Sequence, residues 1–84
     1  MPTPFSGRTT LRYALPRAGV ASVAVYNSAG RLVRTLTSGS AEAGHHVAAW
    51  DGRDEAGTRV APGVYYCRMS AGEFRAMRKL VKLD

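Results

Sequence analysis

The feature that most constrains the fold of this chain is an acidic, glycine-punctuated segment directly after a tryptophan. It runs from Trp50 to Gly57 with the letters WDGRDEAG, and a Pro62-Gly63 corner then opens an alternating aromatic strand. Glycine adopts backbone angles that other residues resist, and aspartate side chains cap their own turns. The order predicts hairpin turns, and we interpret these residues as structural: Trp50, Asp51, Gly52, Asp54, Gly57, Pro62, Gly63 and Tyr65.

Apolar residues alternate with a period of two through almost the whole chain, which favours strands over helices. Six clear strands are predicted, over residues 9–15, 21–26, 31–37, 45–50, 63–70 and 74–83, with a marginal one at 59–60. Val33 and Leu36 are three residues apart, so placing both inward requires a bulge. Short strands separated by turns at this spacing are typical of an all-β, immunoglobulin/fibronectin-like β-sandwich of about seven antiparallel strands.

The expected core is built around Trp50, which we place between the two sheets. Cys67 shares a strand face with Tyr65 and Met69 and is therefore expected inside. The inward face of the last strand stays open between two sets: Phe74, Ala76 and Leu80, or Met77, Val81 and Leu83.

The 84 residues are expected to form a single domain, 1–84. A chain of this size buries only about 60–65% of its unfolded surface, which argues against a deep substrate pocket. Its start, Met1-Pro2-Thr3-Pro4, has no signal-peptide pattern, and no apolar run is long enough for a transmembrane segment. We therefore expect a piece excised from, or the C-terminal end of, a longer exported precursor, located outside the cell or on its surface.

The net charge of +6 is spread along the chain, and its densest cluster, Arg75, Arg78, Lys79 and Lys82, is expected to form a solvated strand face. No concentrated basic stripe or recognisable motif points to nucleic acid. Cys67 is the only cysteine, so no intrachain disulfide can form.

The candidate reactive groups do not assemble into a catalytic or metal-binding pattern. Asp51, Asp54 and Glu55 lack the spacing of a calcium loop, and the adjacent His45 and His46 leave opposite faces of a strand. A buried Cys67 thiol is unreactive. We expect no enzyme activity, no cofactor and no metal.

Two longer stretches resemble a known family. Residues 25–36, VYNSAGRLVRTL, resemble the "V-Y-D-x-x-G-R-x-V-x-x-L" run of the immunoglobulin-like domain of flagellar hook-cap proteins. Residues 43–54, AGHHVAAWDGRD, are similar to the "A-G-x-H-x-x-x-W-D-G-R-D" segment of the same family, and Gly63-Val64-Tyr65 to its "G-V-Y". The resemblance implies an immunoglobulin-like module.

The two ends resemble a second group, the C-terminal sorting domains of proteins secreted by the type IX system. Thr3-Pro4-Phe5 with residues 10–16, TLRYALP, is similar to the opening of those tails, although Thr3 replaces the usual Asn. Residues 78–83, RKLVKL, are similar to their basic-apolar ending, although Asp84 follows the usual final residue. The resemblance implies that secretion machinery reads the terminal segment.

The sequence therefore predicts a non-catalytic C-terminal sorting or attachment domain, read by secretion or cell-surface machinery. The alternative is a structural module of an extracellular assembly, hook-cap-like or filament-forming, whose partner is another protein or copies of itself. An exposed edge strand is a template for adding a strand, so we expect partner binding at Arg75, Arg78, Lys79, Leu80, Val81 and Lys82. A carbohydrate-binding domain would need an exposed aromatic platform, for which Tyr26 and Tyr66 are the candidates.

Overall fold

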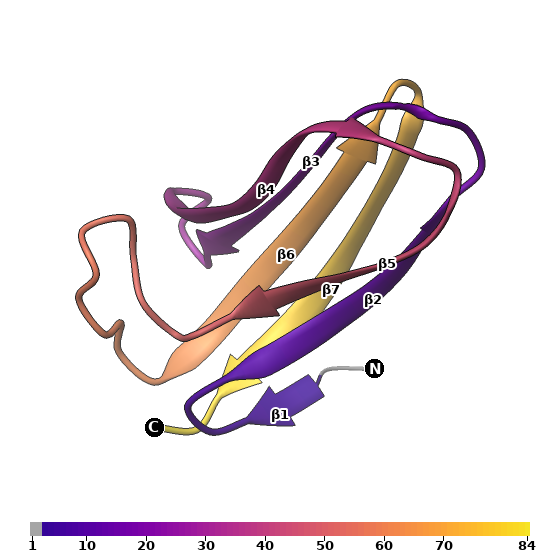
Figure 1. Cartoon of the computed structure of the whole chain (residues 1–84). Coiled ribbons are helices and arrows are strands. Elements are labelled where there is room, and N and C mark those ends of the chain that lie inside the picture. Colours follow the sequence, from indigo (N-terminus) through magenta and orange to yellow (C-terminus); the bar gives the residue numbers. More distant parts are fainter. Residues whose placement is uncertain (1–2) are drawn as a thin grey trace.

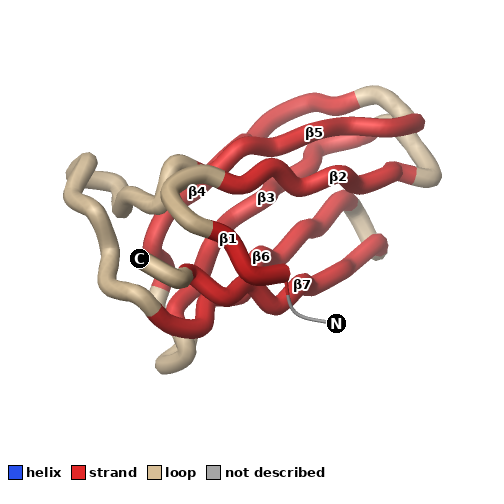
Figure 2. The backbone as a smooth tube through the Cα atoms, turned by 90° about the horizontal axis from the view of Figure 1, so that it is seen from below, coloured by secondary structure: helices blue, strands red, loops and turns tan. Residues whose placement is uncertain are grey.

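The computed structural model describes residues 3–84 and folds them into two facing β-sheets (Figures 1 and 2). Residues 1 and 2 of the expected domain lie outside the described part. The strands are β1 (Thr3–Phe5), β2 (Thr9–Leu15), β3 (Gly19–Asn27), β4 (Leu32–Ala41), β5 (Gly44–Trp50), β6 (Gly63–Ala71) and β7 (Phe74–Lys82). One sheet has the order β1-β7-β6-β3-β4 and the other pairs β2 with β5, which confirms the predicted all-β sandwich.

Two details of the predicted strand set were wrong. The seventh strand is β1, and residues 59–60 contribute only an isolated bridge between Arg53 and Arg59. β1 also runs parallel to β7, whereas every other pairing is antiparallel. A three-residue segment containing Pro4 gives almost no period-two signal, so only the tertiary pairing defines it as a strand.

The expected irregularity near Val33 and Leu36 is present. The register between β3 and β4 shifts twice, once beside Val23 and once beside Tyr26. Each shift inserts an extra β4 residue, which turns both Val33 and Leu36 toward the core although they are three residues apart.

The core fills the space between the sheets around the fully buried Trp50. The rings of Phe5 and Tyr65 pack against Trp50 at centroid distances of 5.6 and 5.2 Å. Cys67 is fully buried and Met69 is nearly so, as their shared face with Tyr65 predicts. On β7, Leu80 is buried, which selects the first of the two inward faces left open by the sequence; Met77 and Leu83 are 60% exposed.

Candidate interaction surface

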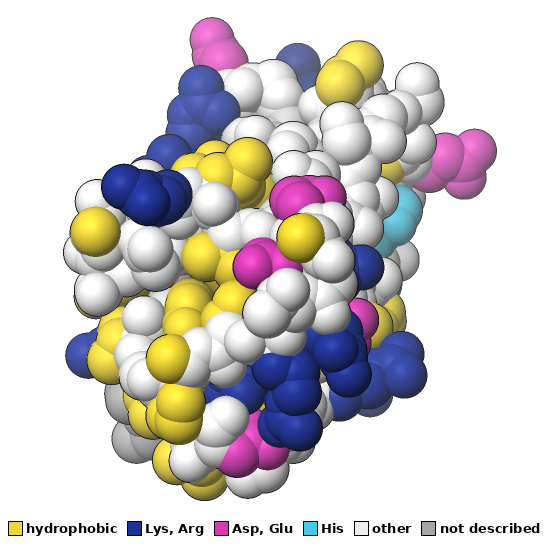
Figure 3. Space-filling model, turned by 90° about the vertical axis from the view of Figure 1, so that its left-hand side faces the viewer, with side chains coloured by type: hydrophobic (Ala, Val, Ile, Leu, Met, Phe, Trp, Pro, Cys, Tyr) yellow, Lys and Arg dark blue, Asp and Glu magenta, His cyan; other side chains and the backbone are white. Residues whose placement is uncertain are grey.

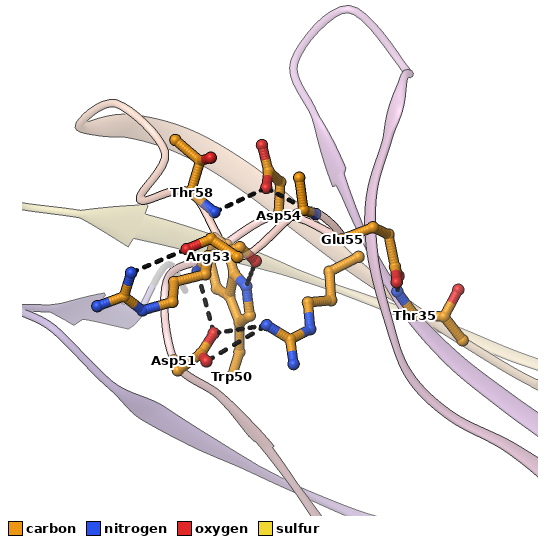
Figure 4. A network of polar contacts seen from close by, with 10 residues as sticks. Thr35, Trp50, Asp51, Arg53, Asp54, Glu55 and Thr58 are labelled. Atoms are coloured by element: carbon orange, nitrogen blue, oxygen red, sulfur yellow. Dashed lines mark hydrogen bonds and ion pairs between the residues drawn. The ribbon is translucent and has the colours of Figure 1, made fainter.

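The segment from Trp50 to Thr58 folds as a self-capped loop that is anchored to the core (Figure 4). The indole N–H of Trp50 donates to the backbone carbonyl of Arg53 at 3.0 Å, which ties the loop to the buried ring. Asp51 accepts from the backbone N–H of Arg53, and Asp54 accepts from those of Ala56 and Thr58. The acidic side chains therefore act as turn caps here.

The carboxylates of this loop are directed to separate partners. Asp51 pairs with Arg34 of β4 at 3.0 Å, and Glu55 accepts the backbone N–H of Thr35. Within residues 3–84, no group of three or more metal-ligating side chains gathers. The loop thus holds itself and the neighbouring strand in place.

Glu55 also covers part of the edge of the large sheet. Its carboxylate takes the Thr35 N–H, while its own backbone N–H donates to the carbonyl of Val33 at 3.2 Å. Both β4 groups would otherwise point outward from an edge strand, where another strand can pair with them. The β4 edge at Val33 and Thr35 is therefore occupied by the chain itself.

Lys82 is the main departure from the predicted basic strand face. Its side chain is fully buried, and its ammonium group donates to the backbone oxygen and to Oδ1 of Asp84, the latter at 3.2 Å. Asp84 also accepts from the backbone N–H of Gly7 and pairs with Arg59 at 3.0 Å. The Gly7 hydrogen bond, followed by the Lys82 contact, lowers the pKa of Asp84. Lys82 is buried because these groups satisfy its charge next to β1 and the loop.

The last strand is consequently not an open edge along its whole length. β1 pairs with Leu80, Val81 and Lys82, so this part of the predicted partner-binding segment is covered. Leu80 and Lys82 point into the molecule and Val81 is half-buried, which removes the first two from any surface contact. The expectation of a fully accessible terminal strand was wrong because β1 adds to it in parallel.

The remaining part of β7 is accessible. Arg75, Arg78 and Lys79 are exposed, and in the described part of the chain no strand pairs with residues 74–79 on the side away from β6. Three basic side chains therefore lie along the one stretch of β7 that leaves backbone groups unpaired.

The outer face of the large sheet brings together residues that are distant in sequence. Tyr26 of β3 lies directly opposite Tyr66 of β6, and opposite Leu32 of β4 on its other side. Tyr66 in turn lies opposite Lys79 of β7. These four residues form one row across four strands, which we call the tyrosine row.

Arg68 and Met77 complete this surface. The guanidinium carbon of Arg68 lies 4.7 Å from the centroid of the Tyr26 ring, a cation–π contact. Met77 lies opposite Arg68 on β7 and is 60% exposed. Figure 3 shows the end of the molecule that carries the β3–β4 turn and the 51–62 loop, where hydrophobic side chains are exposed beside Lys and Arg groups. The sequence analysis did not select Arg68 or Met77, because only the strand register places them beside Tyr26.

The other candidate reactive residues have structural surroundings. His46 stacks on Tyr13 at 5.4 Å, and its Nε2 lies 2.7 Å from the carbonyl oxygen of Glu42, while His45 is exposed on the opposite face. Burial raises the pKa of the Cys67 thiol to about 11, partly opposed by the charge of Arg78. A thiol that stays protonated at neutral pH is a poor nucleophile. None of the described residues forms a helix capable of crossing a membrane.

Fold and surface together define a small immunoglobulin-like module with a partly accessible β7 edge, a tyrosine row on the outer face of the large sheet and a self-capped loop. Residues 4–73 match the family described as the FlgD Ig-like domain, and the chain belongs to that family. The structure of FlgD from P. aeruginosa is similar, with a TM-score of 0.66 and 25% sequence identity over 86% of this chain. The chain spans 58% of that structure's length. No curated protein sequence matches the chain.

These findings correct the main functional expectation. Both comparisons point to the hook-cap kind of module, and neither supports a type IX sorting tail. The structure gives a physical reason, because the supposed terminal signal at residues 78–83 is largely built into the sheet by β1 and β6. The sorting interpretation was therefore wrong, and the alternative of an assembly module fits better.

Proposed function

We propose that this domain is a non-catalytic structural module of an extracellular, hook-cap-like assembly, and that it acts through protein–protein contacts. The observation that carries the proposal is the match of residues 4–73 to the FlgD Ig-like domain. The module is exported as part of a longer precursor.

The open part of β7 is the contact surface that we assign to this function. Unpaired backbone groups on an edge strand can bind an extended segment of a partner, and charged side chains limit which segments are accepted. Arg75, Arg78 and Lys79 supply three such charges on residues 74–79. Leu80 and Lys82 contribute indirectly, by fixing the covered end of the strand.

The test is whether the parent protein is located in surface appendages. An epitope-tagged chromosomal copy should be recovered with appendages sheared from the producing bacterium, and a version lacking residues 3–84 should be exported but lost from them. Tagged protein found only inside the cell, or an unchanged amount of the shortened version in the appendages, would overturn the proposal.

A further inference from the structure

We propose that the tyrosine row, with Arg68, binds an acidic polysaccharide whose sugars carry carboxylate groups. This site lies on the outer face of the large sheet and is separate from the open edge of β7, although Lys79 borders both. Neither the family match nor the proposed assembly role assigns a ligand to it.

The first argument is the geometry of the row. Neighbouring strands lie about 4.8 Å apart, so the four residues from Leu32 to Lys79 extend over roughly 14 Å across the sheet. A linear polymer lying across the strands would meet Leu32, Tyr26, Tyr66 and Lys79 in succession. Aromatic faces pack well against the C–H surface of a sugar ring while the phenol hydroxyls bond to its edge.

The second argument is a hollow on this face, at the end next to the β3–β4 turn. Its volume is about 210 Å³, and it is lined by Tyr26, Tyr66, Arg68 and Met77 together with the turn residues Asn27, Ser28 and Gly30. This space accommodates one sugar ring. In the described part of the chain, the hydroxyls of Tyr26 and Tyr66 make no hydrogen bond, whereas that of the buried Tyr65 donates to Ala61 at 2.6 Å. The hydroxyls of these two half-buried tyrosines are therefore free to bond to a ligand.

The third argument is charge. The ionisable side chains at outward strand positions are Arg68, Arg75 and Lys79, and no Asp or Glu occupies an outward position of β3, β4, β6 or β7. Arg68 is already held over the Tyr26 ring at 4.7 Å, and it makes no ion pair within residues 3–84. A guanidinium held in this way can present its N–H groups to a carboxylate in the paired geometry that strengthens such contacts. The face is thus complementary to a polymer that repeats one negative charge per unit.

Other polyanions share the charge that this face complements, so the test compares them directly. Single-stranded nucleic acid, which binds by stacking successive bases on aromatic faces, is the first alternative that the test includes. An acidic protein segment is the second alternative, because the hollow is lined mainly by apolar surface, which a protein interface also uses.

Affinity electrophoresis of the purified domain in gels containing polygalacturonate tests the proposal, with dextran, polyglutamate and a thymidine oligonucleotide as comparison polymers. Polygalacturonate should retard the domain most, and added salt should weaken the effect. Tyr66→Ala and Arg68→Gln should each weaken binding at least tenfold, while Tyr66→Phe retains most of it. The matched control is Arg12→Gln, which removes an exposed charge from β2 of the other sheet and should leave binding unchanged.

Three results would overturn the proposal: no retardation by polygalacturonate at low salt, equal or stronger retardation by the oligonucleotide or polyglutamate, or equal losses in Arg12→Gln and Arg68→Gln. Circular dichroism of each variant verifies that it is folded, and Arg68→Gln alone decides the matter if Tyr66→Ala does not fold. The assay uses the isolated polymer and no appendage, so its outcome is independent of the proposed assembly role.

Discussion

Replacing Gly52 by alanine tests how the loop, the start of the chain and its end are packed together. Gly52 is buried and has a φ of +76°, in the left-handed region that favours glycine. A Cβ atom at this position would lie 2.8 Å from the carbonyl oxygen of Gly7 and 2.8 Å from Cε of Lys82. Both distances are shorter than real Cβ contacts, so a neighbour has to move.

Neither neighbour is free to do so. The Gly7 oxygen belongs to the backbone, and the adjacent N–H of Gly7 is bonded to Asp84. The Lys82 side chain is fully buried, with its ammonium group held by the same Asp84. Overpacking of this kind costs about 1–3 kcal/mol. The left-handed backbone adds roughly 1–2 kcal/mol for an alanine, partly offset by about 0.4–1 kcal/mol from the unfolded state.

Gly57→Ala is the matched control. Gly57 lies in the same loop with a φ of +84°, but nothing lies within 4 Å of its hypothetical Cβ. Both variants therefore carry the same cost of a left-handed alanine and the same gain from the unfolded state. The difference between their free energies of unfolding isolates the close contact of the Gly52 Cβ position with Gly7 and Lys82. Urea denaturation followed by Trp50 fluorescence should show Gly52→Ala less stable than Gly57→Ala by about 1–3 kcal/mol. Equal stabilities would refute the close approach of Gly52, Gly7 and Lys82.

Three further predictions concern the core and the titrating groups. Trp50→Ala should destabilise the domain by about 3–5 kcal/mol in urea denaturation, because a fully buried large aromatic side chain is lost. A loss of stability below about 1 kcal/mol would contradict the place of Trp50 in the core. The pKa of Asp84 is lowered from its usual 3.8, so its contacts stabilise the fold above about pH 4, and this stabilisation is lost as the pH falls through the folded-state pKa. The free energy of unfolding of Asp84→Asn, measured against pH, should therefore fall less steeply below about pH 4 than that of the unchanged protein. An equally steep fall in both would contradict this. The folded Cys67 thiol has a pKa of about 11, whereas the unfolded thiol loses its proton near pH 9. The free energy of unfolding should therefore fall between these two pH values, and it should fall less steeply in Cys67→Ala. Parallel plots of this free energy against pH for the two proteins would exclude the contribution.

The sequence predicts those parts of the fold that depend on local chemistry. The alternation along residues 63–70 determines which side chains of β6 point inward, and the aspartates of the 51–58 loop cap their own turns. The spacing of Val33 and Leu36 requires the irregular pairing that β4 shows. In each case, the physical cause lies within a few residues of its effect.

The features that the sequence did not predict depend on distant pairing. β1 covers the end of β7 through a parallel register that a three-residue segment cannot reveal. Lys82 is buried against the usual preference of lysine because Asp84, Gly7 and Gly52 meet around it. The candidate surface was predictable only in part: Tyr26 and Tyr66 are recognisable as outward-facing aromatics, but their direct opposition follows from the register of β3 and β6.

Site-specific cross-linking in the producing bacterium tests the central claim, that the domain is a protein-binding module of an external assembly. A photo-reactive amino acid replaces Arg78 on the open part of β7 in the full parent chain, and Val47, which is 64% exposed on β5 of the other sheet, serves as the control position. We predict a discrete adduct between position 78 and a subunit of the surface appendage, with little or none from position 47. Equal labelling from both positions, or no adduct with any appendage subunit, would contradict the account.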